Sequence, residues 1–247
     1  MDEQMACGPE GCEVPAETGA EALPLAGVAQ RIDVISDAIC PWCWVGKANL
    51  DRALALLAQQ GERFTVAWHP FQLNPDMPRE GVERASYRAA KFGNEERGRQ
   101  LDAQVAQAGA AAGVAFRHDL MQRTPNTVEA HRLIALAGAR GVQHAMVEAL
   151  FRAYFQQGLD IGSRAVLAEV AKEAALDPAE VREFLDSGDL DAEIRQQDFS
   201  FRQAGISGVP SFAMDGHLLF SGAMPAEQMA SAFLRARGIL RERAKAA

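Results

Sequence analysis

The four cysteines are the residues of this chain best suited to do chemistry, and all four lie within its first 43 positions. Cys7 and Cys12 are separated by four residues, whereas Cys40 and Cys43 enclose only two, in the sequence CPWC. A cysteine thiolate is both a nucleophile and a metal ligand, so closely spaced cysteines either exchange disulfides or bind a metal. In a reducing compartment, such pairs are more often redox-active or metal-binding than structural.

The CPWC sequence lies where a short strand is expected to lead into a helix. Residues 31–36 are rich in β-branched side chains, and Leu and Ala recur at helical spacing from Pro41 to about Gln60. Pro41 suits the first helical turn, because its missing N–H would have no partner there. At a helix N-terminus, unpaired N–H groups and the helix dipole favour a thiolate. We therefore predict Cys40 as the nucleophile and Cys43, three residues on along the same helix face, as the resolving thiol.

A zinc site is the alternative for the same cysteines. Four thiolates, taken from both cysteine pairs, would complete a tetrahedral ligand set. Zinc knuckles usually place small residues in tight turns, whereas Pro41 and Trp42 here enter a long helix, which favours redox chemistry without a metal. For Cys7 and Cys12 three interpretations stay open: incidental exposed thiols, a second redox pair that passes electrons to the CPWC pair, or a metal clip.

The remainder of the sequence predicts one α/β domain with a helical insertion. Residues 64–69 alternate like a strand and complete a β-α-β unit. Residues 211–214 and 218–221 flank an Asp-Gly turn, which predicts a hairpin, and a last helix follows it. Between these parts, helical periodicity and capping residues recur throughout the middle of the chain. The predicted parts are an α/β domain of residues 31–78 and 199–247 and a helical insertion domain of residues 79–198.

Residues 1–30 carry six acidic side chains and no lysine or arginine, and they are rich in Glu, Gly, Pro and Ala. This composition predicts a flexible acidic N-terminal tail rather than a packed element. The net charge of the chain, −8, therefore comes mostly from the tail and argues against a nucleic-acid partner bound through a basic face. No apolar run approaches the ~18 residues of a membrane span, and the lack of a basic and then apolar leader predicts a cytoplasmic protein.

Val209 and Pro210 directly precede the first strand of the predicted hairpin. By itself, this proline marks only the boundary between a loop and a strand. Beside a C-x-x-C helix a second interpretation gains weight. A cis peptide bond at Pro210 would expose the backbone of Val209 for pairing with a substrate peptide.

Four segments together resemble the DsbA-like branch of the thioredoxin superfamily, and within it the FrnE-like group of thiol–disulfide oxidoreductases. The segments are SDAICPWCWVGK, WHPFQLNPDMP, NTVEAHRLIALA and GISGVPSFAMDG, within about residues 31–237. The resemblance implies a thioredoxin fold interrupted by a large α-helical insertion. It also implies Cys40 as nucleophile, Cys43 as resolving thiol and Pro210 as a cis proline that faces the disulfide.

We expect such an enzyme to act on protein or small-molecule disulfides without a metal or organic cofactor. Glutathione, as a co-substrate, or a thioredoxin-type partner would recycle the dithiol. The periplasmic DsbA proteins carry a secretory signal and a histidine between their cysteines. This chain has neither feature, since Trp42 takes the place of the histidine, and this argues against a strongly oxidising role.

Two other functions compete with disulfide exchange. The superfamily also contains kappa-class glutathione transferases and 2-hydroxychromene-2-carboxylate isomerases, which usually carry a serine and no C-x-x-C where this chain has Cys40 and Cys43. That difference favours disulfide exchange over glutathione-dependent isomerase or transferase chemistry. The second competitor is a binding module, either held together by zinc or acting as a chaperone-like holdase through the helical insertion.

Three polar residues outside CPWC are further candidates. Asn126 and His131 lie in the segment NTVEAHRL. Either Asn126 caps a helix and His131 packs or lies at the surface, or both line a cleft between the helical insertion and Cys40. Asp33, on the strand before the CPWC helix, either takes a proton from Cys43 during exchange or is an exposed or strand-edge carboxylate.

Overall fold

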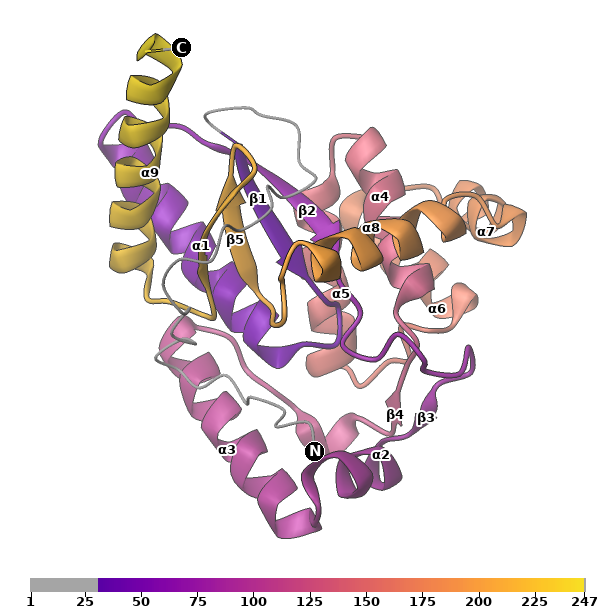
Figure 1. Cartoon of the computed structure of the whole chain (residues 1–247). Helices are drawn as coiled ribbons and strands as arrows, with labels where there is room; N and C mark the ends of the chain where they lie inside the picture. Colours follow the sequence, from indigo (N-terminus) through magenta and orange to yellow (C-terminus); the bar gives the residue numbers. More distant parts are fainter. Residues whose placement is uncertain (1–30, 247) are drawn as a thin grey trace.

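A four-stranded mixed sheet lies at the centre of the structure, a computed structural model that describes residues 31–246 (Figure 1). Its strands run in the order β2-β1-β5-β6. β1 pairs in parallel with β2, and β5 is antiparallel to both β1 and β6. The bounds are Arg31–Ser36 for β1, Thr65–Pro70 for β2, Ser211–Met214 for β5 and His217–Ser221 for β6. This is the sheet of a thioredoxin fold, as the resemblance implied.

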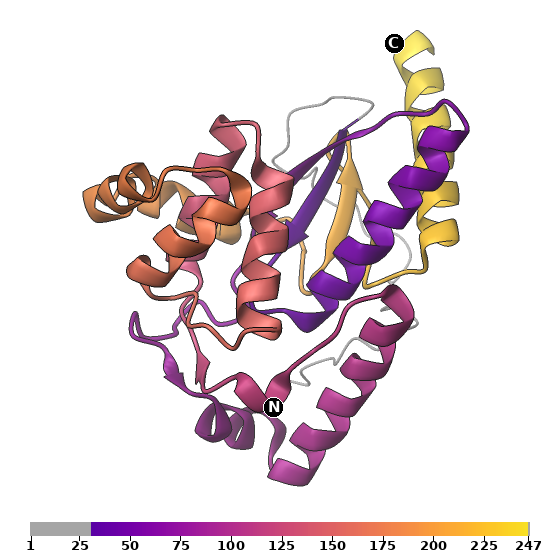
Figure 2. The same cartoon turned by 180° about the vertical axis from the view of Figure 1, so that it is seen from behind.

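Helices α1 (Pro41–Gln59) and α9 (Ala226–Ala246) lie side by side on one face of the sheet (Figures 1 and 2). α1 joins β1 to the parallel strand β2, so it is the crossover helix of the predicted β-α-β unit. Its buried positions include Leu50, Ala53 and Leu57, which recur at helical spacing. This apolar stripe holds α1 against the core and fixes the direction of its first turn.

The insertion between β2 and β5 is mostly helical. Its helices are α2 (Arg84–Phe92), α3 (Glu95–Ala112), α4 (Val128–Ala139), α5 (Gln143–Phe155), α6 (Arg164–Val170), α7 (Pro178–Ser187) and α8 (Asp191–Gln203). Two short strands, β3 (Val82–Glu83) and β4 (Arg123–Thr124), form a separate antiparallel pair that the sequence analysis did not predict. The predicted boundary between residues 198 and 199 lies inside α8.

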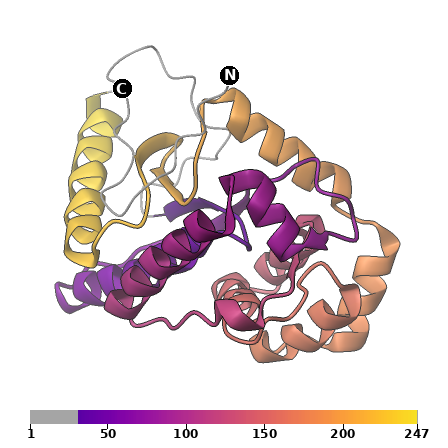
Figure 3. The ribbon, with the colours of Figure 1, turned by 90° about the horizontal axis from the view of Figure 1, so that it is seen from below.

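The insertion packs along the β2 edge of the sheet and over the face opposite α1. At the edge, the side-chain amide of Gln143 on α5 accepts from the backbone N of Trp68 and donates to its O, at 2.9 and 3.0 Å. These bonds satisfy backbone groups that an edge strand would leave open. On the other face, α8 lies away from α1 (Figure 3), and Phe201 of α8 contacts the ring of His69.

One apolar core joins the sheet, α1 and the insertion. Trp44 of α1 stacks on Phe155 and Phe151 of α5, with ring centroids 5.7 and 6.5 Å apart, and meets the edge of Phe116 at 4.9 Å. The helix that carries CPWC is therefore buried on one side by the insertion itself. No helix in the described part of the chain is long and apolar enough to cross a membrane.

Candidate active site

Cys40 occupies the N-cap position of α1, and Pro41 is the first residue of the helix. Cys40 has an extended backbone, with φ −85° and ψ 114°, and its side chain makes no capping hydrogen bond. Its N–H donates to the carbonyl of Asp37 at 3.0 Å, and its own carbonyl accepts from the N–H of Cys43 at 3.0 Å. Local sequence thus places the sulfur at the positive end of the helix dipole, as predicted. Both cysteines are free thiols in this structure.

Cys43 lies under Cys40 and is completely buried. Burial, together with a hydrogen bond to the sulfur of Cys40 and the charge there, raises the pKa of the Cys43 thiol well above its usual value. Hydrogen bonds from the Ser36 hydroxyl and the Asp37 backbone act in the opposite direction but do not outweigh burial. In the reduced protein, Cys43 is therefore a protonated thiol held against its partner.

The loop before β5 faces Cys40. The Val209–Pro210 peptide bond is cis, and the Cys40 thiol donates to the Val209 carbonyl, with 3.5 Å between sulfur and oxygen. The Pro210 carbonyl accepts from Gly222 N–H at 2.8 Å, which ties this loop to the residue after β6. Val209 and Pro210 are thus brought to the dithiol from 169 positions away.

Gly46 is a site residue that the sequence analysis missed. A Cβ at this position would lie 2.8 Å from Cγ of Pro210 and 3.6 Å from Cζ of Phe212. The absence of a side chain lets α1 approach the Pro210 loop closely enough for Cys40 to reach Val209. A glycine inside a helix lowers helix stability, so its presence within 41–60 was the available signal for a close approach.

The predicted side chains Asn126 and His131 are both buried, and the structure assigns them different positions. Asn126 lies one residue before Thr127, the N-cap of α4, so the prediction that Asn126 is the cap is off by one residue. Its side-chain oxygen accepts from Val128 N–H at 3.0 Å, and its amide donates to the carbonyl of Met77 at 2.7 Å. His131 lies against the loop that carries the cysteines, with Nε2 3.4 Å from Oδ1 of Asp37. His131 is therefore buried against the segment that precedes Cys40 rather than at the surface.

The expectation that Asp33 is an exposed or strand-edge carboxylate is wrong. Asp33 is completely buried, because β1 is a central strand flanked by β2 and β5. Its Oδ1 contacts the side chains of Arg31 and His69 at 2.9 and 2.8 Å. Side chains alternate along a strand, so Asp33 lies on the sheet face opposite Ser36, the residue that contacts Cys43.

An apolar cluster adjoins the outer cysteine. Trp42, half-buried, packs on a small cluster of Val45, Ala112 and Ala223, together with Ala48, Ala108, Val114 and Phe116. These residues come from α1, from the end of α3 with its following loop, and from the segment after β6. Val45, Ala112 and Ala223 are themselves buried, so this is a small core cluster, and only its partly buried members such as Trp42 reach the surface.

Within residues 31–246, no three His, Cys, Asp or Glu side chains gather in a way that could hold a metal. Cys7 and Cys12 lie outside the described residues, so both the second redox pair and the four-thiolate zinc site stay predictions.

Comparison with known proteins matches most of the chain to one family of thioredoxin-like domains. The model of the DSBA-like thioredoxin domain matches residues 31–234. The uncharacterized protein YwbO of Bacillus subtilis (strain 168) is 25% identical over 194 residues, 78% of this chain and 90% of YwbO.

Two solved structures share the fold. A probable DsbA oxidoreductase, SCO1869 from Streptomyces coelicolor, is 32% identical with a TM-score of 0.75, covering 84% of this chain and 90% of its own. The cytosolic disulfide reductase DsbM from Pseudomonas aeruginosa, solved with GSH, is 20% identical with a TM-score of 0.57, covering 87% and 99%.

Proposed function

The chain belongs to the family of DsbA-like thioredoxin domains, and from that premise we propose that it is a thiol–disulfide oxidoreductase whose redox pair is Cys40 and Cys43. One observation carries the proposal. Cys40 sits at the N-cap of α1, facing the Val209 carbonyl, and Cys43 lies buried beneath it within hydrogen-bonding distance. A nucleophile and its resolving thiol need this arrangement.

The exchange proceeds in two steps. The Cys40 thiolate attacks one sulfur of a client disulfide, so a Cys40–client bond forms and the client S–S bond breaks, releasing the first client thiolate. Cys43 then attacks the Cys40 sulfur, forming the Cys40–Cys43 disulfide and releasing the second client thiolate. Two electrons pass from the dithiol to the client, and the reverse sequence oxidises a client dithiol.

The surroundings of Cys40 support the first step. Cys40 lies at the positive end of the α1 dipole, which favours negative charge at that position. The half-buried side chain of Trp42 is placed to contact the apolar part of a client, and the backbone of Val209 is placed to pair with a client peptide.

Three finer proposals accompany this function: a FrnE-like subtype, recycling by glutathione or a thioredoxin-type partner, and a cytoplasmic location. The structural relative DsbM, a cytosolic disulfide reductase solved with GSH, supports glutathione as the recycling thiol and the cytoplasm as the location.

The test compares insulin-disulfide reduction by the full chain and by two variants, Cys40→Ser and Cys43→Ser, all in a Cys7→Ser/Cys12→Ser background. We expect both active-site variants to lose turnover, and only Cys43→Ser to accumulate a covalent adduct with the client. A glutathione-dependent isomerase or transferase needs no resolving thiol. Undiminished turnover of a small aromatic substrate by Cys43→Ser would therefore overturn the proposal in favour of that chemistry.

A further inference from the structure

The second step of exchange requires Cys43 to lose its proton in a place that bulk solvent does not reach. Cys43 is completely buried, and burial opposes its ionisation. Among the described residues, the donors to its sulfur are the Ser36 hydroxyl and the Asp37 backbone N–H. A backbone amide cannot take up a proton at ordinary pH, whereas a hydroxyl accepts one and donates one. Ser36 is therefore the group through which the proton can leave.

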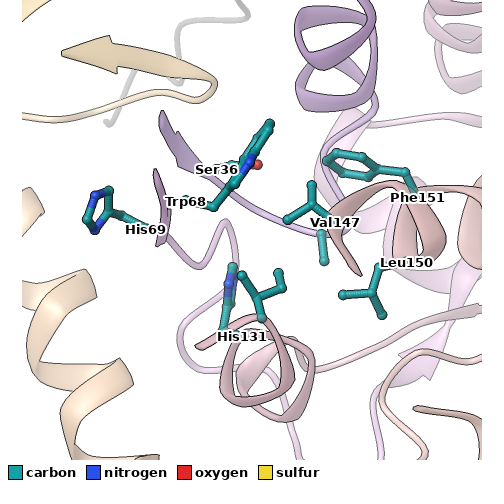
Figure 4. Close-up of a pocket in the computed structure, with 9 residues that line it drawn as sticks. Ser36, Trp68, His69, His131, Val147, Leu150 and Phe151 are labelled. Carbon is teal, nitrogen blue, oxygen red and sulfur yellow. The ribbon is translucent and has the colours of Figure 1, made fainter. Parts of the chain in front are cut away.

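Ser36 lines a small enclosed cavity that His131 also lines (Figure 4). The cavity has a volume of about 10 Å³, which is close to the space that one water molecule occupies. Its other walls are mainly apolar, from Ala38, Trp68, Ile134, Val147, Leu150 and Phe151, with His69 at one side. Besides His69, His131 of α4 is the lining side chain that can accept a proton passed on from Ser36.

Asp37 and His131 form a buried pair, with 0% and 3% of their surface exposed. Oδ2 of Asp37 accepts from Leu73 N–H at 2.7 Å. Oδ1 has no hydrogen-bond partner among the described residues and lies 3.4 Å from Nε2 of His131. Nε2 also lies 3.2 Å from the carbonyl oxygen of Phe71. Both neighbours of Nε2 are acceptors, so this nitrogen carries the proton of the neutral ring and the other is free to accept one.

We propose that Asp37 and His131 act as one buried acid–base pair that takes the proton of Cys43, through Ser36, when Cys43 attacks the mixed disulfide. In that step the Cys43–Cys40 bond forms, the Cys40–client bond breaks, the client leaves as a thiolate and the proton stays on the pair. When the Cys40–Cys43 disulfide opens again, the pair returns the proton to Cys43. The proton belongs to the coupled pair rather than to one atom. This inference rests on the proposed function.

Each of the other ionisable groups around the pair has its own partner, stays in one protonation state or takes part in the reaction itself. On α8, Asp198 and Arg202 form an ion pair that holds Gln72 by its backbone. On α5, burial raises the pKa of Tyr154, and the charge of Asp37 adds to this rise. Its phenol therefore stays neutral below pH 10. On β2, His69 contacts Asp33. On α1, the sulfur of Cys40 is the atom that Cys43 attacks.

Asp33 offers a matched control for Asp37. Both carboxyl groups are completely buried within the same strand and loop, and each has one oxygen without a hydrogen-bond partner among the described residues. Asp33, however, is paired with Arg31 and His69 on the face of the sheet away from Ser36. An Asp33→Asn variant therefore removes a buried carboxylate that lies outside the proposed route, apart from its contact with His69 at the side of the cavity.

The experiment follows the two releases of thionitrobenzoate when reduced protein, in the Cys7→Ser/Cys12→Ser background, reacts with Ellman's reagent. The first release reports attack by Cys40, and the second reports resolution by Cys43. We expect Asp37→Asn and His131→Gln to slow the second release about tenfold or more at pH 7, within the range of general-base effects. The first release should stay within about twofold of the wild-type rate. The slowing of the second release should shrink toward pH 9, because a growing fraction of Cys43 is then already ionised before it reacts.

Each outcome decides the inference. An unchanged second release in both variants overturns it, as does an equal slowing at every pH or the same slowing in Asp33→Asn. If Asp37→Asn does not fold, the same two rates measured on His131→Gln decide between these outcomes. A wild-type protein with no second release would instead count against the proposed function, because its Cys43 would not resolve a mixed disulfide at all.

Discussion

Replacing Gly46 by alanine tests whether the close approach of α1 to the Pro210 loop builds the site. The new Cβ would lie 2.8 Å from Cγ of Pro210, whereas ordinary contacts begin near 3.4 Å. The helix and the loop must therefore separate by about 0.6 Å, since a proline ring cannot turn away as a flexible side chain does. Such overpacking costs about 1–3 kcal/mol in other protein cores.

The same substitution also gains helix propensity, because alanine stabilises a helix interior by about 0.5–1 kcal/mol relative to glycine. Gly238, inside α9, isolates that gain, since a Cβ there would meet no atom within 4 Å. We expect Gly238→Ala to raise the free energy of unfolding by the propensity term alone. The difference between the two variants then measures the clash at Gly46, about 1–3 kcal/mol.

Urea unfolding of both variants and insulin-disulfide reduction supply the two measurements. Separating α1 from the loop lengthens the contact between the Cys40 sulfur and the Val209 carbonyl, now 3.5 Å, so Gly46→Ala should also lose activity severalfold. Gly238→Ala should keep full activity. If Gly46→Ala is as stable and as active as Gly238→Ala, the loop does not depend on this approach and the reasoning is refuted.

Two further predictions concern buried groups. Burial raises the pKa of Cys43 above its unfolded value, so its stabilisation is complete below about pH 8.5 and is lost as pH rises toward the folded pKa. Urea unfolding of the reduced protein should therefore show stability falling by up to ~1.4 kcal/mol per pH unit above that point, a slope that Cys43→Ala lacks. Arg132 is fully buried and donates to the carbonyls of Phe184, Leu185 and Asp189; Arg132→Met should cost about 3–5 kcal/mol of unfolding free energy, with little recovery in Arg132→Lys.

The sequence predicts the strands and the dithiol helix well because their signals are local. Residues 31–36 and 211–214 are strands with the expected bounds, and α1 begins at Pro41, where the missing N–H of proline was the signal. The cap expected at Asn126 is one residue off, since Thr127 is the N-cap of α4, although Asn126 does accept from the N–H of Val128. Each of these depends on residues within a few positions of one another, and periodicity and capping report such relations directly.

The contacts that complete the site depend on chain segments that the sequence does not order in space. Asp33 is buried because β5, from the far end of the chain, pairs on one side of β1 and β2 pairs on the other. The need for Gly46 comes from Pro210, and the two-residue pair of β3 and β4 carries no periodic signal at all. Periodicity within one segment cannot report which segment lies against it.

His131 illustrates the same limit and its functional consequence. Its burial against Asp37 requires α4 of the insertion to lie behind the loop of the dithiol. The insertion also shares a core with α1 through Trp44. The helical insertion therefore contributes apolar walls and the His131 side chain to the cavity that Ser36 also lines. A loosened insertion should then slow resolution by Cys43 more than attack by Cys40, because only the inner thiol depends on what α4 holds in place.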